Sequence, residues 1–529
     1  MRRRLGTGLI LLLVLAGCSD GQDEDEADAE AVADDLATAL EAGDFGDLDL
    51  SGATSKQVRR DYRAVVDGMS GREPTVEVTG VELGDDDTAT ATLSWSWPVG
   101  DDQAWTYDSE AELVRSGDAW EVTWARSTVH PDLTDTGVLD ASTVAGRRGD
   151  IVGAGGQKIV TDRPVVEVGV DKSKVSPAQA SRLARQVAAA TGVDVAPYVK
   201  QVKASGAAAF VRAITYRADD VPAAVRSLSG TAGVLLLDGQ LPLAPTREFA
   251  APILGTVGDV TAEMVKENPE LYQPGDRAGL SGLQARYDEE LRGRDGFVVD
   301  AVEEDGSETE LFRLDDADGR PLELTMDVRL QTAAERALAG VGPASALVAI
   351  RPSDGAILAA ANGPGNGGQN LATYGQYAPG STFKTVSSLA LLRAGLKPDT
   401  TVECPPTTVV DGKQFKNYSD YPSSALGRIP FRVALANSCN TAFITERDRL
   451  EGLDLFNAAA SLGMGIDHDL GFPAFFGSLE PPASETEAAA DMIGQGKVLA
   501  SPMTMATVIA SVQAGKVVVP RLIETVEVE

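Results

Sequence analysis

Alternating polar and apolar residues dominate the chain between residues 75 and 124. Such alternation predicts β-strands with one buried face, and it occurs at residues 75–78, 89–97, 111–114 and 120–124. A helical pattern precedes these strands at residues 56–69. Short strands joined by Gly and Asp turns favour an antiparallel sheet packed on helices, so we expect residues 31–137 to form a small α+β domain. His130 stands beside Pro131 in this domain, and we interpret it as a structural residue.

The pattern becomes mixed between residues 138 and 323. Strand alternation occupies residues 165–170, and Ser176-Pro177 is a typical helix start that predicts a helix through residue 188. Leu283, Tyr287 and Leu291 recur every four residues, which predicts one buried face of an amphipathic helix. We expect this region to form an elongated, β-rich pedestal.

Two nearly continuous apolar segments open the region from residue 324 to residue 529. Residues 344–350 and 356–361 are joined by Pro352-Ser353-Asp354-Gly355, whose residue types favour a tight turn. The pair therefore predicts a β-hairpin, and its apolar character predicts a sheet that is covered on both faces. A helix is expected before the hairpin, at residues 330–338, and helical patterns dominate after it.

The N-terminus has the pattern of an export signal. Three arginines in residues 1–4 precede an apolar run over residues 5–16, which is shorter than the roughly 20 residues of a membrane span. The run ends in Leu15-Ala16-Gly17-Cys18, which resembles a bacterial lipobox. We expect residues 1–17 to be a lipoprotein signal peptide and Cys18 to carry the lipid; the alternatives are an ordinary secretory signal and an uncleaved anchor. Residues 18–30 are rich in Asp and Glu and are predicted to be a solvated tether.

Charge and composition argue against several kinds of chemistry. Lys and Arg total 46 against 79 Asp and Glu, which gives a net charge of −33, and so acidic a surface repels nucleic acid. The only two histidines of the sequence are His130 and His468. That supply argues against a multi-histidine metal site and against a Ser-His-Asp triad. We therefore expect no metal ion and no organic cofactor.

A candidate nucleophile stands at the start of a predicted helix. Pro379-Gly380 interrupts the preceding structure, and a helical pattern then runs from Ser381 through residue 392. Ser381 and Lys384 are three residues apart and therefore share one helix face. The free N–H groups of a helix N-terminus favour negative charge, and an amine whose pKa is lowered can deprotonate a serine. Taken alone, Ser-x-x-Lys is a weak motif, because Ser381 can equally be a helix cap.

A second polar motif, Ser438-Cys439-Asn440, follows 57 residues after Ser381. Apolar residues flank it on both sides from residue 434 to residue 442. Polar side chains in such a setting need hydrogen-bond partners if they are buried, and a catalytic cleft would supply them. The two motifs in this order, with Pro-Gly before the first, form a much more specific pattern than either motif does alone.

Ser-x-x-Lys followed by Ser-x-Asn resembles the penicillin-recognising serine enzymes. Within them the chain resembles a class B penicillin-binding protein, a peptidoglycan D,D-transpeptidase, over about residues 146–520. Arg148-Gly149-x-Ile151 and Gly494-Gln495-Gly496 also match that family. Residues 31–137 are similar to the nuclear-transport-factor-like extension of some members. The implied fold is multidomain α+β: this small extension, a β-rich pedestal or dimerisation domain at 138–323, and a transpeptidase domain with α/β/α layers and an antiparallel sheet at 324–529.

The resemblance also implies a reaction and a role for each motif residue. Ser381 would attack the D-alanyl-D-alanine carbonyl of a peptidoglycan stem peptide and form an acyl-enzyme, and β-lactams would acylate the same serine. Lys384 would deprotonate Ser381, Ser438 would relay the proton to the leaving amine, and Asn440 would hold the substrate amide. The implied location is the extracytoplasmic face of the bacterial membrane, with lipid attachment at Cys18. A glycan polymerase or the division or elongation machinery would be the protein partner, and the Arg148 region would make contacts between lobes or with it.

One element of the family pattern is missing from the sequence. After Asn440 the lysines are Lys497 and Lys516, and neither is followed by Thr-Gly or Ser-Gly. We expect the sequence to be a fragment of an intact enzyme, which makes its transpeptidase domain incomplete. A catalytically inactive scaffold of the cell-wall machinery is one alternative. A serine β-lactamase is another, but the large N-terminal regions and the Ser-x-Asn motif argue against it.

Besides Cys18, the sequence has two cysteines, Cys404 and Cys439. They could pair, since both fall near the proposed site. Because Cys439 lies inside an apolar segment, where a free thiol behaves as a small hydrophobic group, we favour free thiols.

Overall fold

The computed structural model describes residues 20–526 except 86, 101–102, 145 and 270. The chain divides into two compact units. One unit contains the residues up to Gly146 together with Arg294–Ala317, and the other contains Arg147–Gly293 and the residues from Asp318 onward. No helix of the described residues has both the length and the apolar character that crossing a membrane requires.

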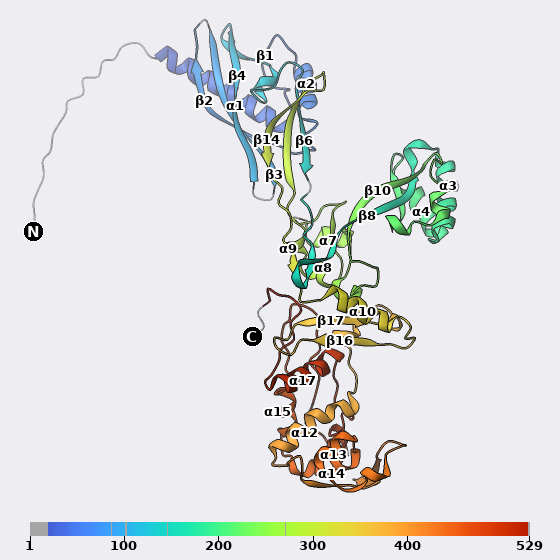
Figure 1. Cartoon of the computed structure of the whole chain (residues 1–529). Helices are drawn as coiled ribbons and strands as arrows, with labels where there is room; N and C mark the ends of the chain where they lie inside the picture. The colour runs from blue at the N-terminus through green and yellow to red at the C-terminus, as the bar shows by residue number, and fades with distance from the viewer. Residues whose placement is uncertain (1–19, 86, 101–102, 145, 270, 527–529) are drawn as a thin grey trace, which may run out of the picture. The chain divides into compact units, whose positions relative to one another are not determined.

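The first unit is built on a five-stranded sheet in the order β1-β5-β4-β3-β2. The four predicted strands are present. Three of them are longer than expected, namely β2 (Thr75–Leu83), β3 (Thr88–Gly100) and β4 (Gln103–Ser116), and β5 (Ala119–Thr123) has the expected length. Strand β1 (Leu50–Ser51) was not predicted. Helices α1 (Asp20–Ala42) and α2 (Ser55–Val66) belong to the same unit (Figure 1). Trp95 and Trp97 on β3 are fully buried, so the alternation in the sequence marks the core face of this sheet.

The acidic segment is helical from Asp20, which the prediction of a tether did not include, although residues 26–28 and Glu30 are exposed as expected of a solvated segment. Residues Ala29, Ala33, Leu36 and Leu40 of α1 are fully buried in the core that contains Trp95. Their spacing of three and four places them on one helix face, which is why the helix packs on the sheet despite its many carboxylates. Cys18 and the proposed signal peptide lie outside the described residues.

His130 packs among aromatic side chains in the first unit. It is 5% exposed, and the centroid of its ring lies 4.4 Å from the centroid of the Tyr107 ring and 5.3 Å from that of the Trp105 ring, which confirms its structural role.

A second sheet of the first unit, in the order β14-β13-β6, is formed by β6 (Val138–Val144), β13 (Gly296–Val302) and β14 (Glu308–Leu314). Phe297 on β13 joins the Trp95 core, so these strands pack with the N-terminal unit.

The second unit contains a lobe formed by a three-stranded antiparallel arrangement and two helices. Strand β8 (Gln157–Asp171) pairs with both β9 (Phe210–Arg217) and β10 (Val234–Leu243). Helices α3 (Pro177–Thr191) and α4 (Val195–Ala204) pack against these strands (Figure 1). Ser176 caps α3 as predicted, because its side chain accepts a hydrogen bond from Gln179 N while the Gln179 side chain bonds back to Ser176 N.

A buried ion pair organises the part of the second unit next to this lobe. Arg148 donates to Asp288 Oδ1 at 2.6 Å and to the side chain and carbonyl of Gln284. The carboxylate of Asp288 also accepts from Gly279 N and from Tyr272 OH. Side-chain exposure is 9% for Arg148 and 6% for Asp288, so each charge is compensated by several hydrogen bonds rather than by water.

The helix predicted around Leu283 and Leu291 is broken into two. Helix α8 (Gly282–Arg286) and helix α9 (Asp288–Leu291) meet at Tyr287, whose φ of −112° and ψ of 28° are not helical. Leu283 and Leu291 are both buried as expected, while the Tyr287 hydroxyl donates to Gly471 O at 3.1 Å. The predicted burial of Leu283 and Leu291 was therefore right, whereas the prediction of one continuous helix was wrong.

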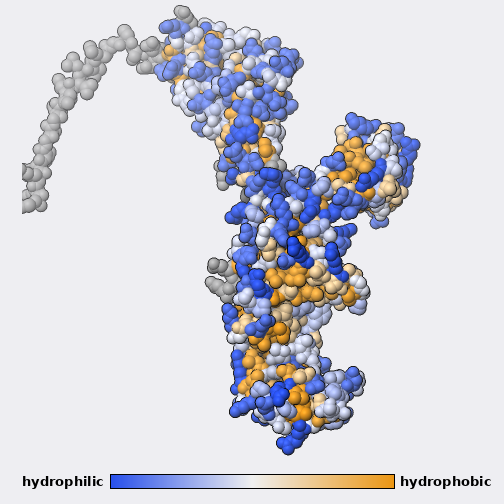
Figure 2. Space-filling model, viewed as in Figure 1, coloured by the Kyte–Doolittle hydropathy of each residue, from blue (hydrophilic) through white to orange (hydrophobic). Residues whose placement is uncertain are grey.

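The predicted hairpin is present as β16 (Ala346–Ile350) and β17 (Ile357–Asn362). It lies between α10 (Val328–Leu338) and α17 (Pro502–Ala514), so helices cover both faces (Figure 1). Residues of β17 are mostly buried, whereas those of β16 are only half-buried, and Figure 2 shows apolar surface in this part of the molecule. The turn is held by Asp354, which pairs with Arg351 at 2.7 Å and accepts from Ala356 N.

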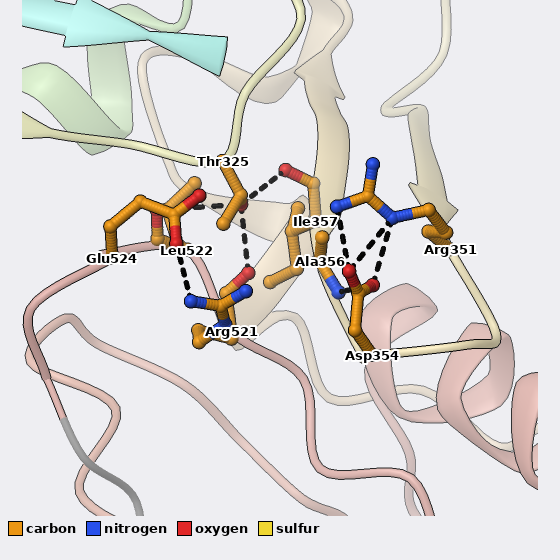
Figure 3. A network of polar contacts seen from close by, with 8 residues as sticks. All are labelled: Thr325, Arg351, Asp354, Ala356, Ile357, Arg521, Leu522 and Glu524. Atoms are coloured by element: carbon orange, nitrogen blue, oxygen red, sulfur yellow. Dashed lines mark hydrogen bonds and ion pairs between the residues drawn. The ribbon is translucent and has the colours of Figure 1, made fainter. Parts of the chain in front are cut away.

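A segment near residue 522 runs beside the start of β17 (Figure 3). Ile357 N donates to Arg521 O at 2.8 Å, and Thr325 N donates to Leu522 O at the same distance. The Thr325 hydroxyl lies 2.9 Å from Ile357 O and 2.8 Å from Arg521 O. These bonds join three parts of the chain that are far apart in sequence and fix the base of the hairpin.

Candidate active site

The Ser381 motif lies on a sharp turn that leads into a buried helix. A 3₁₀ turn, η6 (Gly380–Phe383), comes first, and the α-helix α12 (Lys384–Arg393) follows, so the α-helix starts three residues later than predicted. Gly380 has a φ of +57° and donates its N–H to Gly494 O at 2.8 Å. The turn leaves Ser381 exposed and Lys384 buried.

Lys384 is the centre of the site. Its Nζ lies 3.1 Å from Ser381 Oγ, 2.9 Å from Ser438 Oγ, 3.0 Å from Ser438 O and 2.6 Å from Asn440 Oδ1. The structure thus brings all four predicted site residues together. Each of the contacting oxygen atoms belongs to a hydroxyl, a backbone carbonyl or a side-chain amide, so all of them are neutral.

The surroundings of Lys384 favour its neutral form. The residue is 1% exposed, and burial lowers its pKa from 10.5 to about 8. Neutral acceptors orient the amine but repay little of the cost of burying a charge. An amine with such a pKa can accept a proton near neutral pH, which is the property required of a base for Ser381.

Asn440 and Ser438 approach Lys384 from a neighbouring pair of helices. Helix α13 (Phe431–Ala436) ends before Ser438, and α14 (Asn440–Thr445) begins at Asn440. Asn440 Nδ2 donates to Lys416 O at 3.0 Å, which directs the amide oxygen towards Lys384. Ser438 has a φ of +54°, a left-handed conformation that is uncommon for a residue with a side chain.

Cys439 and Cys404 form a disulfide, with 6.3 Å between their Cα atoms, so the prediction of free thiols is wrong. Both cysteines are fully buried. Apolar neighbours around Cys439 suited a free thiol equally well. Only the fold places Cys404, at the end of β18 (Thr401–Cys404), beside the loop that carries Ser438 and Asn440.

The sequence argument assigned no role to two further residues of the site. Asn417 accepts from Thr441 N with its side-chain oxygen and donates to Pro405 O, so it ties the Asn440 helix to the strand region. Gly494 has a φ of +67°, and a Cβ there would lie 2.1 Å from Gly380 O. The quoted Gly-Gln-Gly motif marks Gly494, whereas no local pattern marks Asn417, since an isolated Asn in a loop is common.

Three family models match successive parts of the chain. The NTF2-like N-terminal transpeptidase domain matches residues 28–137, the Penicillin-binding Protein dimerisation domain matches 143–324, and the Penicillin binding protein transpeptidase domain matches 345–528. With the Ser-x-x-Lys and Ser-x-Asn residues gathered around one amine, these matches define the class. The chain belongs to the penicillin-binding proteins, and within them to class B members with an NTF2-like N-terminal domain.

Curated relatives and a solved structure agree with this assignment. The chain is 25% identical over 316 residues to "Peptidoglycan D,D-transpeptidase MrdA" of Salmonella typhimurium (strain SL1344), which covers 52% of this chain and 50% of that protein. It is 23% identical over 462 residues to "Penicillin-binding protein 3" of Bacillus subtilis (strain 168), covering 78% of this chain and 65% of the other.

A chain from a structure titled "Structural coordination of polymerization and crosslinking by a peptidoglycan synthase complex" is also similar. It superimposes with a TM-score of 0.54 and 25% identity over 74% of this chain and 73% of that chain. Of the two curated relatives, the chain spans about half the length of the Salmonella protein and 65% of the length of the Bacillus protein.

Proposed function

We propose that this protein is a serine D,D-transpeptidase that cross-links peptidoglycan stem peptides through an acyl-enzyme on Ser381. The observation that carries the proposal is the position of Lys384 Nζ, within 3.1 Å of Ser381 Oγ, Ser438 Oγ and Asn440 Oδ1. Similarity to a peptidoglycan D,D-transpeptidase favours this activity over a β-lactamase or an inactive scaffold.

In the acylation step, neutral Lys384 accepts the hydroxyl proton while Ser381 Oγ attacks the carbonyl of the D-alanyl-D-alanine bond. Ser438 lies 2.9 Å from the same amine and passes the proton on to the departing D-alanine nitrogen. Asn440 holds the substrate amide. The backbone N–H of Ser381 is one donor to the developing oxyanion.

The acyl-enzyme is then resolved by an amine from a second stem peptide. Attack by this amine forms the new amide bond, breaks the ester to Ser381 and returns the proton to the serine through Lys384. A β-lactam enters the same route, because its strained amide carbonyl occupies the place of the D-alanyl-D-alanine carbonyl. Its acyl group stays on Ser381 when no amine can reach the ester.

For location, we propose attachment to the outer face of the cytoplasmic membrane through lipid on Cys18. The arginines, the apolar run and the lipobox-like residues before Cys18 support this location. The Cys404–Cys439 disulfide supports it independently, since structural disulfides persist in oxidising compartments outside the cytoplasm. For a partner, we propose a glycan polymerase or another protein of the cell-wall machinery, in keeping with the synthase-complex structure that the chain resembles.

The proposal is tested by intact-mass spectrometry after incubation with a fluorescent penicillin. The expected result is one covalent adduct on the chain and none on a Ser381→Ala variant. Thr382→Ala is the matched control, because Thr382 is the exposed neighbour of Ser381 and has no contact with Lys384 among the described hydrogen bonds. A folded chain that forms no adduct would overturn the proposed activity for this polypeptide.

A further inference from the structure

Ser438 has an unusual backbone that something must hold in place. It is one of five non-glycine residues with a positive φ in the described part of the chain. The left-handed region is unfavourable for residues with a Cβ, and such a conformation persists only where its surroundings impose it. This conformation places both Ser438 O and Ser438 Oγ about one hydrogen-bond length from Lys384 Nζ, at 3.0 and 2.9 Å.

Cys439, the residue after Ser438, is held through both its backbone and its side chain. Cys439 N donates to Ala434 O at 2.8 Å, which ties the loop back to α13. The Cys439 side chain is bonded covalently to Cys404, which is 35 residues earlier in the sequence and ends β18. The disulfide therefore connects the peptide between Ser438 and Asn440 to a strand of another part of the domain.

Hydrogen bonds around the disulfide also hold the loop that carries Ser438 and Asn440. Pro405 O, next to Cys404, accepts from Thr441 Oγ1 at 2.7 Å and from Asn417 Nδ2 at 3.2 Å. Thr441 follows Asn440 directly, and its N–H donates to Asn417 Oδ1 at 3.2 Å. The loop from Ser438 to Thr441 is thus held at its middle by the disulfide and at its end by Asn417 and Pro405.

We propose that the Cys404–Cys439 disulfide is a positioning element of the active site, which holds Ser438 in its left-handed conformation against the Lys384 amine. This inference rests on the proposed function, because it assigns the disulfide a part in the same acyl transfer. Its physical basis is geometric: the covalent bond fixes the one residue that lies between the two polar side chains of the second motif. The cysteines themselves touch neither the substrate nor the reacting atoms.

Loss of the bond has a consequence that differs from simple destabilisation. A relaxed Ser438 would withdraw two of the four oxygen atoms around Lys384 Nζ and admit water to the amine. Rehydration favours the charged form, so the pKa of Lys384 would rise from about 8 towards its ordinary value of 10.5. The rate of acylation would then fall at neutral pH and recover at higher pH.

The test compares the intact chain with a Cys404→Ser/Cys439→Ser variant. Serine keeps the side chains small, and Thr441 and Asn417, which lie beside the sulfur atoms, offer partners for the new hydroxyls. Val402→Ala is the matched control: Val402 is 2% exposed and lies on β18 in the same hydrophobic core as both cysteines, so its truncation also loosens this core but leaves the disulfide intact. Acylation by a fluorescent penicillin is measured from pH 6 to pH 10, and hydrogen exchange is measured for residues 436–442.

We expect the double variant to be acylated about tenfold more slowly at pH 7, with the midpoint of its rate–pH curve moved upward by about one unit. Faster hydrogen exchange at residues 436–442 should accompany the change. Val402→Ala should melt at a lower temperature but keep the midpoint of the intact chain. An unchanged midpoint in the double variant, or the same shift in Val402→Ala, would show that the disulfide only stabilises the fold and would overturn the inference.

Failure of the proposed function gives a different result. In that case the intact chain itself is not acylated at any pH, and the hydrogen-exchange comparison alone decides the inference. Unchanged protection of residues 436–442 in a folded double variant would show that Ser438 does not depend on the disulfide.

Discussion

Two positively charged side chains buried in the described part of the second unit, Arg148 beside α8 and Lys384 in the proposed active site, have partners of different charge. Arg148 faces the Asp288 carboxylate at 2.6 Å, and its remaining donors reach Gln284. Lys384 faces two hydroxyls, a carbonyl and an amide, and the aromatic ring of Phe443 lies 5.7 Å away. The two residues are similar in burial and differ in the charge of their partners.

This difference decides what each cation can do. The Asp288 carboxylate compensates the buried charge of Arg148, and a guanidinium does not act as a base in proteins, so this pair stabilises the structure. Lys384 receives hydrogen-bond acceptors without a counter-charge, so burial lowers its pKa to about 8. A buried cation that is paired with a carboxylate stabilises the fold, whereas a buried amine with neutral partners is a candidate base.

The largest effect is expected from replacing Lys384 with a cation that keeps its proton. Lys384→Arg should lower the acylation rate about 10³- to 10⁴-fold, because a guanidinium cannot serve as a base for Ser381. The measurement is the rate of labelling by a fluorescent penicillin, with circular dichroism as the check on folding. A rate within tenfold of the parent chain would show that Lys384 is not the base.

Removing the cation of the structural pair should affect stability rather than chemistry. Arg148→Met should lower the free energy of unfolding by about 3 to 5 kcal/mol, because Asp288 is left charged and buried without its counter-ion. The measurement is denaturant unfolding followed by fluorescence.

The neighbouring residue provides the control for that experiment. Arg147 pairs with Asp318 at 3.1 Å, but its side chain is 78% exposed. Arg147→Met should therefore cost less than about 1 kcal/mol. Equal losses of unfolding free energy in Arg147→Met and Arg148→Met would contradict the distinction between a buried ion pair and a surface ion pair.

A single substitution can give Lys384 the counter-charge that Arg148 has. Asn440→Asp places a carboxylate at the position now 2.6 Å from Nζ, which should raise the pKa of Lys384 and lower acylation at pH 7 by about 10²-fold. The deficit should shrink as the pH rises. Asn440→Leu is the matched control, since it removes the same amide without adding charge, and its deficit should be independent of pH.

The lowered pKa of Lys384 also predicts two effects of pH on the unaltered chain. Because the deprotonated fraction grows with pH, acylation should accelerate about tenfold from pH 6 to pH 7 and level off above pH 8. Between pH 8 and pH 10.5 the unfolded chain binds more protons at this lysine than the folded chain does. The contribution of Lys384 to stability therefore rises with pH across this window, being most unfavourable below pH 8. An acylation rate that is flat from pH 6 to pH 8 would show that deprotonation of Lys384 does not limit the reaction, and a rate that keeps rising up to about pH 10 would show that this amine has an ordinary pKa.

The features that the sequence predicted well depend on neighbouring residues. The hairpin β16–β17 follows from two apolar runs and a turn sequence, and the start of α3 follows from Ser176 and Gln179. Ser381 and Lys384 were brought together by helical spacing alone, although their turn proved to be 3₁₀. Such patterns are readable because the interactions that produce them span only a few residues.

The wrong predictions share a dependence on distant residues. The acidic residues 20–30 looked like a tether, but they belong to α1, which packs on β2, β3 and β5, strands that begin only at Thr75 and beyond. The helix through Tyr287 is interrupted where its hydroxyl reaches Gly471, 184 residues away. Cys404 and Cys439 looked like free thiols because no local pattern reports that the end of β18 meets the start of α14.

The sequence by itself determined most of the helices and strands, the two polar motifs around Ser381 and Ser438, and the kind of chemistry that a serine and an amine can perform. Tertiary structure alone decided that Ser438 and Asn440 reach Lys384, that a disulfide secures the peptide between them, and that the amine is buried without a counter-charge. The physical reason is that the pKa of an amine depends on its solvation and on nearby charges, and these come from residues that folding gathers from across the chain.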